Sequence, residues 1–126
     1  MEKAAKTDMV FMKLEDRCAK RYSLQIKVRY LKKGNSGWAE CEVVDISRKG
    51  VGVKFSLRER IFENSEIYLE IYLPKQLDPM LIQGKVQWIS KAEDGFLSGI
   101  ELTRPLTNEV LDSIIVKYLA VPIVAK

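Results

Sequence analysis

The sequence predicts a mainly β fold: a small six-stranded antiparallel barrel with an α-helix at its C-terminal end. Six short stretches alternate between apolar and polar residues, a period of two that is typical of strands with one buried face. Polar turns containing glycine, asparagine or proline separate many of these stretches. Only the last part of the chain places its apolar residues at helical spacing. Such short strands avoid exposed edges by closing into a barrel, which the helix then closes or plugs.

The first three predicted strands lie in the N-terminal half of the chain. Residues 24–30 alternate strictly, with every second side chain apolar. Residues 33–37 supply two glycines and an asparagine for a turn, and residues 38–46 form the second strand, so the pair is a predicted hairpin. After a polar segment at residues 45–50, the third predicted strand covers residues 51–55.

The other three predicted strands follow a charged surface segment. Residues 67–73 alternate up to Pro74, which ends the fourth strand. Residues 81–89 and 96–102 also alternate, and the polar segment between them contains a glycine. These two strands are therefore expected to form a second hairpin.

The C-terminal element is a predicted amphipathic helix. Thr107 is its expected N-cap, because its hydroxyl can accept a hydrogen bond from the backbone three residues later, and Glu109 suits the first turn. Its apolar residues recur at helical spacing: Val110, Leu111, Ile114, Ile115 and Leu119. Pro122 is expected to end the helix by disfavouring helical geometry at the residue before it.

An apolar strip at residues 121–125 follows the predicted helix. It can lie back on the barrel, pair with a second copy of the chain, or dock on another protein. The C-terminus carries more apolar surface than one helix face on a small barrel can bury. We therefore favour one of the last two uses, which makes a homodimer one expected state.

Composition limits the function. The chain has 126 residues, the size of one domain, and a net charge of +4 that is compatible with a phosphate-bearing partner. It has no histidine, which excludes Ser-His-Asp and Cys-His catalysis and removes the usual nitrogen ligand of zinc. The acidic pairs Glu40/Glu42 and Glu66/Glu70 lie on outward strand faces, where solvated charge is expected. We therefore expect no catalytic residue, no metal site and no cofactor.

The location is predicted from the absence of two signals. No apolar run approaches the roughly 18 residues of a membrane helix, and the N-terminus lacks the apolar stretch of a signal peptide. The two cysteines, Cys18 and Cys41, do not form a disulfide framework. We expect a cytoplasmic protein without membrane insertion.

Two short motifs carry the chemistry. Arg17 and Arg21 lie four residues apart just before the first strand, and Asp45, Ser47 and Gly50 lie between the second and third strands. The planar fork of arginine can meet a phosphate or a guanine edge with two hydrogen bonds. A carboxylate can accept from the N1 and N2 donors of guanine, while serine and glycine permit a close polar approach. Together the motifs predict a site for a phosphorylated guanine.

Each motif also has a purely structural interpretation. The arginines can be solvated surface charges. Asp45 and Ser47 can shape a turn through their side chains, and Gly50 can serve a positive φ alone. Trp88 shares the predicted strand face of Ile82 and Val86, which favours a core position over a ligand-stacking one. We nevertheless include Trp88 among the candidate ligand-binding residues.

With both motifs in this order, the sequence resembles the PilZ domain family, bacterial receptors for cyclic diguanylate. The resemblance divides the chain into an N-terminal tail (1–16), a PilZ-like barrel domain with its helix (17–120) and an apolar C-terminal tail (121–126). It implies that the arginines grip phosphates and guanine edges and that the Asp-x-Ser-x-x-Gly loop holds a guanine. The ligand-binding residues it implies are Arg17, Arg21, Asp45, Ser47 and Gly50.

The resemblance implies a non-catalytic receptor whose ligand orders the segment from Arg17 to Arg21, creating a surface that a protein partner reads. In the family such partners belong to motility, pilus or exopolysaccharide machinery. Members with an arginine directly before the first motif tend to bind a stacked pair of ligands. Here that residue is Asp16, whose negative charge favours one ligand per chain.

Two other functions remain open. One is an interaction module of the same fold that does not bind nucleotide. The other is a basic barrel that binds RNA or single-stranded DNA. The second is disfavoured because Tyr68 and Tyr72 alternate with Glu66 and Glu70, whereas a nucleic-acid surface interleaves aromatic and basic residues. We therefore expect no nucleic-acid partner.

Overall fold

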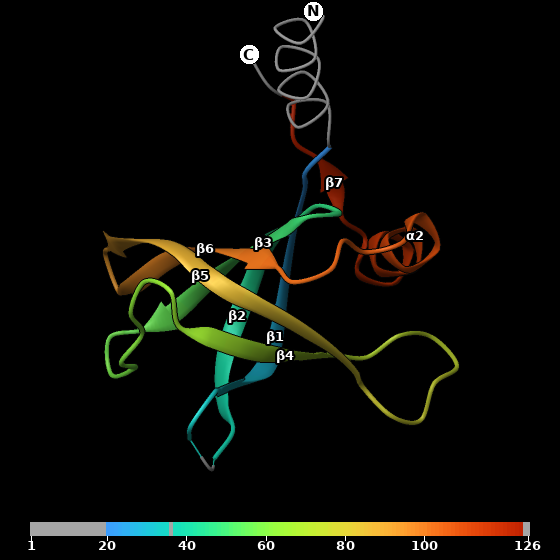
Figure 1. The fold of residues 1–126 in the computed structure, drawn as a ribbon. Coiled ribbons are helices and arrows are strands. Elements are labelled where there is room, and N and C mark those ends of the chain that lie inside the picture. Colours follow the sequence, from blue (N-terminus) through green and yellow to red (C-terminus); the bar gives the residue numbers. More distant parts are fainter. Residues whose placement is uncertain (1–19, 36, 125–126) are drawn as a thin grey trace, which may run out of the picture.

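The computed structural model describes residues 20–35 and 37–124, and this part of the chain forms a closed six-stranded antiparallel barrel followed by a single helix (Figure 1). Around the barrel the strands follow the order β1-β2-β3-β6-β5-β4, and β4 pairs again with β1. The predicted mainly β fold with a C-terminal helix is confirmed. The barrel strands are β1 (Tyr22–Lys32), β2 (Ala39–Ile46), β3 (Gly50–Ser56), β4 (Glu66–Ile71), β5 (Met80–Ala92) and β6 (Gly95–Leu102).

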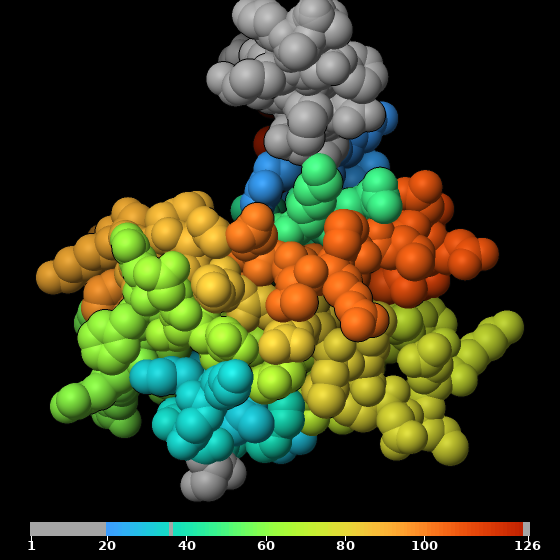
Figure 2. All heavy atoms as spheres, in the orientation of Figure 1, coloured from blue at the N-terminus to red at the C-terminus, as the bar shows by residue number. Residues whose placement is uncertain are grey.

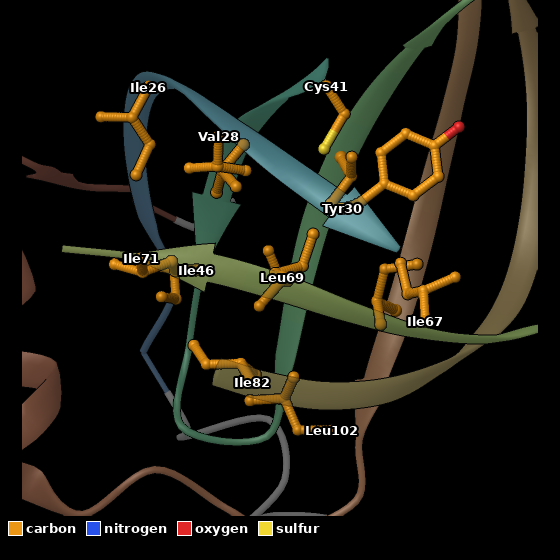
Figure 3. Close-up of a cluster of buried hydrophobic side chains, with 14 of the residues drawn as sticks. Ile26, Val28, Tyr30, Cys41, Ile46, Ile67, Leu69, Ile71, Ile82 and Leu102 are labelled. Atoms are coloured by element: carbon orange, nitrogen blue, oxygen red, sulfur yellow. The ribbon is translucent and has the colours of Figure 1, made fainter. Parts of the chain in front are cut away.

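Both predicted hairpins are present. β1 pairs with β2 and β5 pairs with β6, each antiparallel. The inward faces of the strands fill the barrel with apolar side chains (Figure 3). Among these side chains the rings of Tyr30 and Phe55 meet edge to face, with centroids 5.0 Å apart. Cys41 is buried nearby, and burial raises the pKa of its thiol to about 12, so it behaves as an unreactive apolar side chain.

The helix α2 (Asn108–Tyr118) begins as predicted, because the Thr107 hydroxyl accepts a 3.1 Å hydrogen bond from the backbone of Val110. It buries Leu111 and Ile114. The helix ends earlier than Pro122 requires, because Leu119 adopts a left-handed conformation with φ of 55°. No helix within the described residues has both the length and the apolar character needed to span a bilayer.

A two-residue strand, β7 (Val121–Pro122), follows the helix and pairs with the start of β1. The apolar strip therefore lies back along the barrel through its backbone. Its side chains are nevertheless exposed, by 60% at Val121, 48% at Ile123 and 82% at Val124. The strip is thus not core, and its use in self-association or partner docking remains a prediction.

Candidate functional site

The loop between β2 and β3 is shaped by Ser47. Its backbone N–H donates to the Gly50 carbonyl at 2.9 Å, and its hydroxyl accepts from the backbone N–H groups of Gly50 (3.1 Å) and Lys49 (3.4 Å). Ser47 is buried, so its hydroxyl stabilises the turn from the interior side of the loop. Gly50 does not have a positive φ. A side chain there would instead meet the Ile100 carbonyl at 3.1 Å, so close packing explains the glycine.

The structure brings together one residue from each motif. Arg21, just before β1, donates from Nη2 to Oδ1 of Asp45 near the end of β2, at 2.5 Å. The strand register explains the meeting, because Ser23 pairs with Asp45. The two side chains are 48% and 25% exposed. An ion pair this exposed contributes about 0–1 kcal/mol, so a ligand can open it at low cost. Arg17 lies outside the described residues.

Asp45 lies at a bulge. β2 pairs Val43 with Val53 but Asp45 with Gly52, so Val44 is an extra residue in the ladder. Val43 and Ile46 are fully buried, which leaves Val44 and Asp45 on the outer side between them. The bulge therefore turns the carboxylate outward, toward the rim where Arg21 lies.

A second bulge moves Trp88 out of the core. β5 pairs Val86 with Ile100 but Trp88 with Gly99, so the alternation shifts phase after Val86. Trp88 is consequently 46% exposed, and Ile89 packs against the core instead. The buried Ser98 hydroxyl donates to the Trp88 carbonyl at 3.0 Å and stabilises this arrangement. The prediction of a core position for Trp88 is therefore wrong.

Asp45 and Trp88 flank a pair of glycines. Across four neighbouring strands the register aligns Asp45, Gly52, Gly99 and Trp88 in one row. A Cβ on Gly52 would lie 2.5 Å from an Asp45 carboxylate oxygen, and one on Gly99 would lie 2.2 Å from Nε1 of Trp88. The carboxylate and the indole therefore rest directly over the glycines. We call these four residues the glycine row.

Gly52 and Gly99 are functional candidates that the motif analysis missed. A glycine inside a strand often marks a place where another group approaches the backbone closely, and this signal was present in the sequence. The pairing of the two glycines with each other could not be read without the strand order, which places β6 beside β3.

The arrangement offers three kinds of contact on the outer surface of the barrel. The guanidinium of Arg21 can meet a phosphate, the carboxylate of Asp45 can accept from a base edge, and the face of Trp88 can stack on a base. Figure 2 shows the β2–β3 loop (green) and the chain just before β1 (blue) at the same end of the molecule.

Arg48, in the same loop, has a structural contact. Its Nε donates to the Leu106 carbonyl at 2.9 Å, which connects the loop to the segment before α2.

The described residues contain no group of three or more His, Cys, Asp or Glu side chains that could hold a metal ion.

Comparison with known proteins covers most of the chain. Among curated proteins, none matches this sequence. Among solved structures, the inhibitor of motility of Bacillus subtilis (MotI/DgrA) is similar in fold, with a TM-score of 0.59 and 15% sequence identity. The similarity covers 77% of this chain and 47% of that one, so the chain spans about half the length of that protein. The family described as the PilZ domain matches residues 15–120. The chain is a member of the PilZ domain family.

Proposed function

We propose that this protein is a non-catalytic receptor for cyclic diguanylate. The observation that carries the proposal is the 2.5 Å contact between Arg21 and Asp45, which joins the two motifs at the barrel rim. The exposed indole of Trp88 lies in the same row of the sheet as Asp45. These groups provide a phosphate partner, a guanine-edge acceptor and a stacking surface within one PilZ domain.

Ligand binding replaces the contact between Arg21 and Asp45 with contacts from each of them to the ligand. In the structure the carboxylate of Asp45 accepts from Arg21. When the ligand binds, one of its phosphates accepts hydrogen bonds from the guanidinium of Arg21 in place of Asp45. The carboxylate of Asp45 then accepts from the N1 and N2 donors of a guanine. Ser47 and Gly50 keep the loop in place beneath it. Both charged groups therefore have partners before and after binding, which limits the cost of desolvation.

Signalling follows from the contacts of the ligand with the segment that precedes β1. A ligand shifts a segment between two states only by the difference in its affinity for them. Phosphates that hold Arg17 and Arg21 at once favour the state in which residues 17–21 lie on the barrel. A protein partner in the cytoplasm then reads the changed surface. Because the similar Bacillus subtilis protein is an inhibitor of motility, motility machinery is the first partner to test.

A second candidate function is an interaction module of the same fold without nucleotide binding. Exposed apolar side chains on α2, at its C-cap and on the C-terminal strip favour this alternative, because they offer surface for a partner or a second copy: Val116, Leu119, Val121, Ile123 and Val124. The two functions are separated by adding cyclic diguanylate. A receptor gains or loses its partner with the ligand, and a simple module does not respond to it.

The stoichiometry of binding is predicted to be one cyclic diguanylate per chain. Asp16 directly precedes the first motif and would repel the phosphates of a second, stacked ligand molecule. Native mass spectrometry at increasing ligand concentration measures this directly. The expected spectrum shows the mass of one added ligand per chain, and saturation at two per chain would contradict the role given to Asp16.

Gly99→Ala is expected to weaken ligand binding by about 1 kcal/mol, the lower end of the range for a stacked base. The new methyl group would fall 2.2 Å from Nε1 of Trp88, so the indole must move away from the glycine row. The atoms that it would meet belong to the exposed indole ring and not to the backbone, so a rotation of the Trp88 side chain can relieve the contact and the barrel is expected to stay folded. Calorimetric affinity measures the loss, and adding Gly99→Ala to Trp88→Ala should cause no further loss. Equal affinity of Gly99→Ala and the parent chain would place the base elsewhere.

A further inference from the structure

We infer that the C-terminal segment formed by β7 and Ile123 is a positioning element of the ligand site, because it holds the backbone of Arg21 where the side chain reaches Asp45. This inference rests on the proposed function and adds a requirement to it. Residues at the far end of the sequence, with no group in the site itself, set how well the site is formed. Figure 1 shows β7 beside the first described residues of the chain, drawn in blue.

The contact is made by the backbone. The N–H of Ile123 donates to the carbonyl of Arg21 at 2.9 Å. Pro122 then pairs with Tyr22, and Val121 pairs with Ser23. Hydrogen-bonded and non-hydrogen-bonded pairs alternate along an antiparallel ladder, so the pair of Pro122 and Tyr22 is of the second kind. The missing N–H of proline therefore costs no ladder bond at this position.

The start of β1 needs this second neighbour. On one side it pairs with β2, but the register is irregular between Ser23 and Ile26. On the other side β4 reaches only the far end of β1, from Tyr30 to Lys32. Without β7, the first residues of β1 would form a free edge next to an irregularity, where strands open most readily. β7 supplies the missing neighbour for Tyr22 and Ser23, and Ile123 extends it to the backbone of Arg21.

The side chains of Val121 in β7 and of Ile123 after it play little part in this. Val121 is 60% exposed and Ile123 is 48% exposed, so the barrel core does not hold the strand. The effect should therefore depend on the backbone N–H of Ile123. Removing that N–H therefore tests the contact with Arg21 more directly than removing the Ile123 side chain does.

The test compares Ile123→Pro with Val124→Pro. Proline at 123 removes the N–H that donates to Arg21. Proline at 124 changes a residue that is 82% exposed and whose N–H takes no part in the described hydrogen bonds, and it keeps Ile123 extended. We expect Ile123→Pro to weaken cyclic diguanylate binding about threefold to tenfold, the scale of one hydrogen bond. Val124→Pro should bind like the parent chain, and Ile123→Pro should cause no further loss when added to Arg21→Ala.

Amide hydrogen exchange of the ligand-free chain provides the second measurement. Ile123→Pro should speed exchange at residues 21–23, while the rest of the barrel keeps its protection. Faster exchange there with unchanged ligand affinity would overturn the inference, and so would unchanged exchange. If Ile123→Pro speeds amide exchange throughout the barrel, deletion of residues 123–126 is compared with deletion of residues 124–126 by the same two measurements. If the parent chain does not bind cyclic diguanylate, the proposed function fails, and the exchange result alone decides whether β7 holds Arg21.

Discussion

Arg21→Ala is expected to weaken cyclic diguanylate binding by about 1–3 kcal/mol, roughly 5- to 150-fold, while the barrel stays folded. The guanidinium is half exposed and pairs with Asp45 on the rim, so its loss removes a phosphate contact without opening the core. Calorimetry measures the affinity, and circular dichroism checks the fold.

Arg29→Ala is the matched control, because Arg29 also pairs with a carboxylate from an exposed position on β1. Its Nε and Nη2 donate to Glu70 at 2.8 Å each. Glu70 is buried, so the expectation of a solvated charge at this residue is wrong. Hydrogen bonding to Glu70 raises the pKa of Arg29, with burial opposing the shift. Removing Arg29 leaves a buried carboxylate without its partner, so stability should fall while ligand affinity is unchanged. Parent-like affinity in Arg21→Ala, or an equal affinity loss in Arg29→Ala, would move the site away from the rim.

Gly95→Ala is expected to destabilise the barrel by about 3 kcal/mol, the upper end of the range for an overpacked core. Gly95 begins β6 and pairs with Ser56 on β3. A Cβ there would lie 2.1 Å from the carbonyl oxygen of Phe55, whose side chain is buried in the core. The clash is with backbone, which no rotamer change can relieve, so β3 and β6 must separate. Urea unfolding followed by circular dichroism measures the loss.

Gly37→Ala is the control for the same chemical change. Nothing lies within 4 Å of a Cβ at Gly37, and its φ is not in the left-handed region. Alanine there should leave the free energy of unfolding unchanged or raise it by about 0.4–1 kcal/mol, because the unfolded chain loses freedom. If Gly95→Ala unfolds at the same urea concentration as Gly37→Ala, the close approach of β3 and β6 at this point is wrong.

Most of the barrel could be predicted because alternation directly reflects which side of a strand is buried. Every second residue of β1 from Leu24 to Tyr30 is buried, as its pattern indicates. The bulges could not be predicted in this way. An extra residue at Val44, and another after Val86, shift the phase without changing the local composition. Unbroken alternation along β5 predicts that Trp88 faces the core. The phase shift after Val86 turns it outward instead.

The site was partly predictable for a similar reason. The motifs identified Arg21 and Asp45 because their chemistry is distinctive, and the strand register then brings them together. The glycine row depends on which strands are neighbours, and the chain order does not reveal that β6 lies beside β3. The pairing of β7 with β1 could not be predicted from the sequence either, because two residues are too few to show the alternation of a strand.

The most direct test of the receptor proposal is a calorimetric titration of the full chain with cyclic diguanylate, with guanosine monophosphate and the linear dinucleotide as controls. The proposed function predicts saturable binding of cyclic diguanylate and weaker binding of both controls, since guanosine monophosphate has only one guanine and one phosphate and the linear dinucleotide lacks the closed ring. Competition for the same site should show the same order. An absence of cyclic diguanylate binding, or equal affinity for guanosine monophosphate, would contradict the proposal that the contact between Arg21 and Asp45 marks a cyclic dinucleotide site.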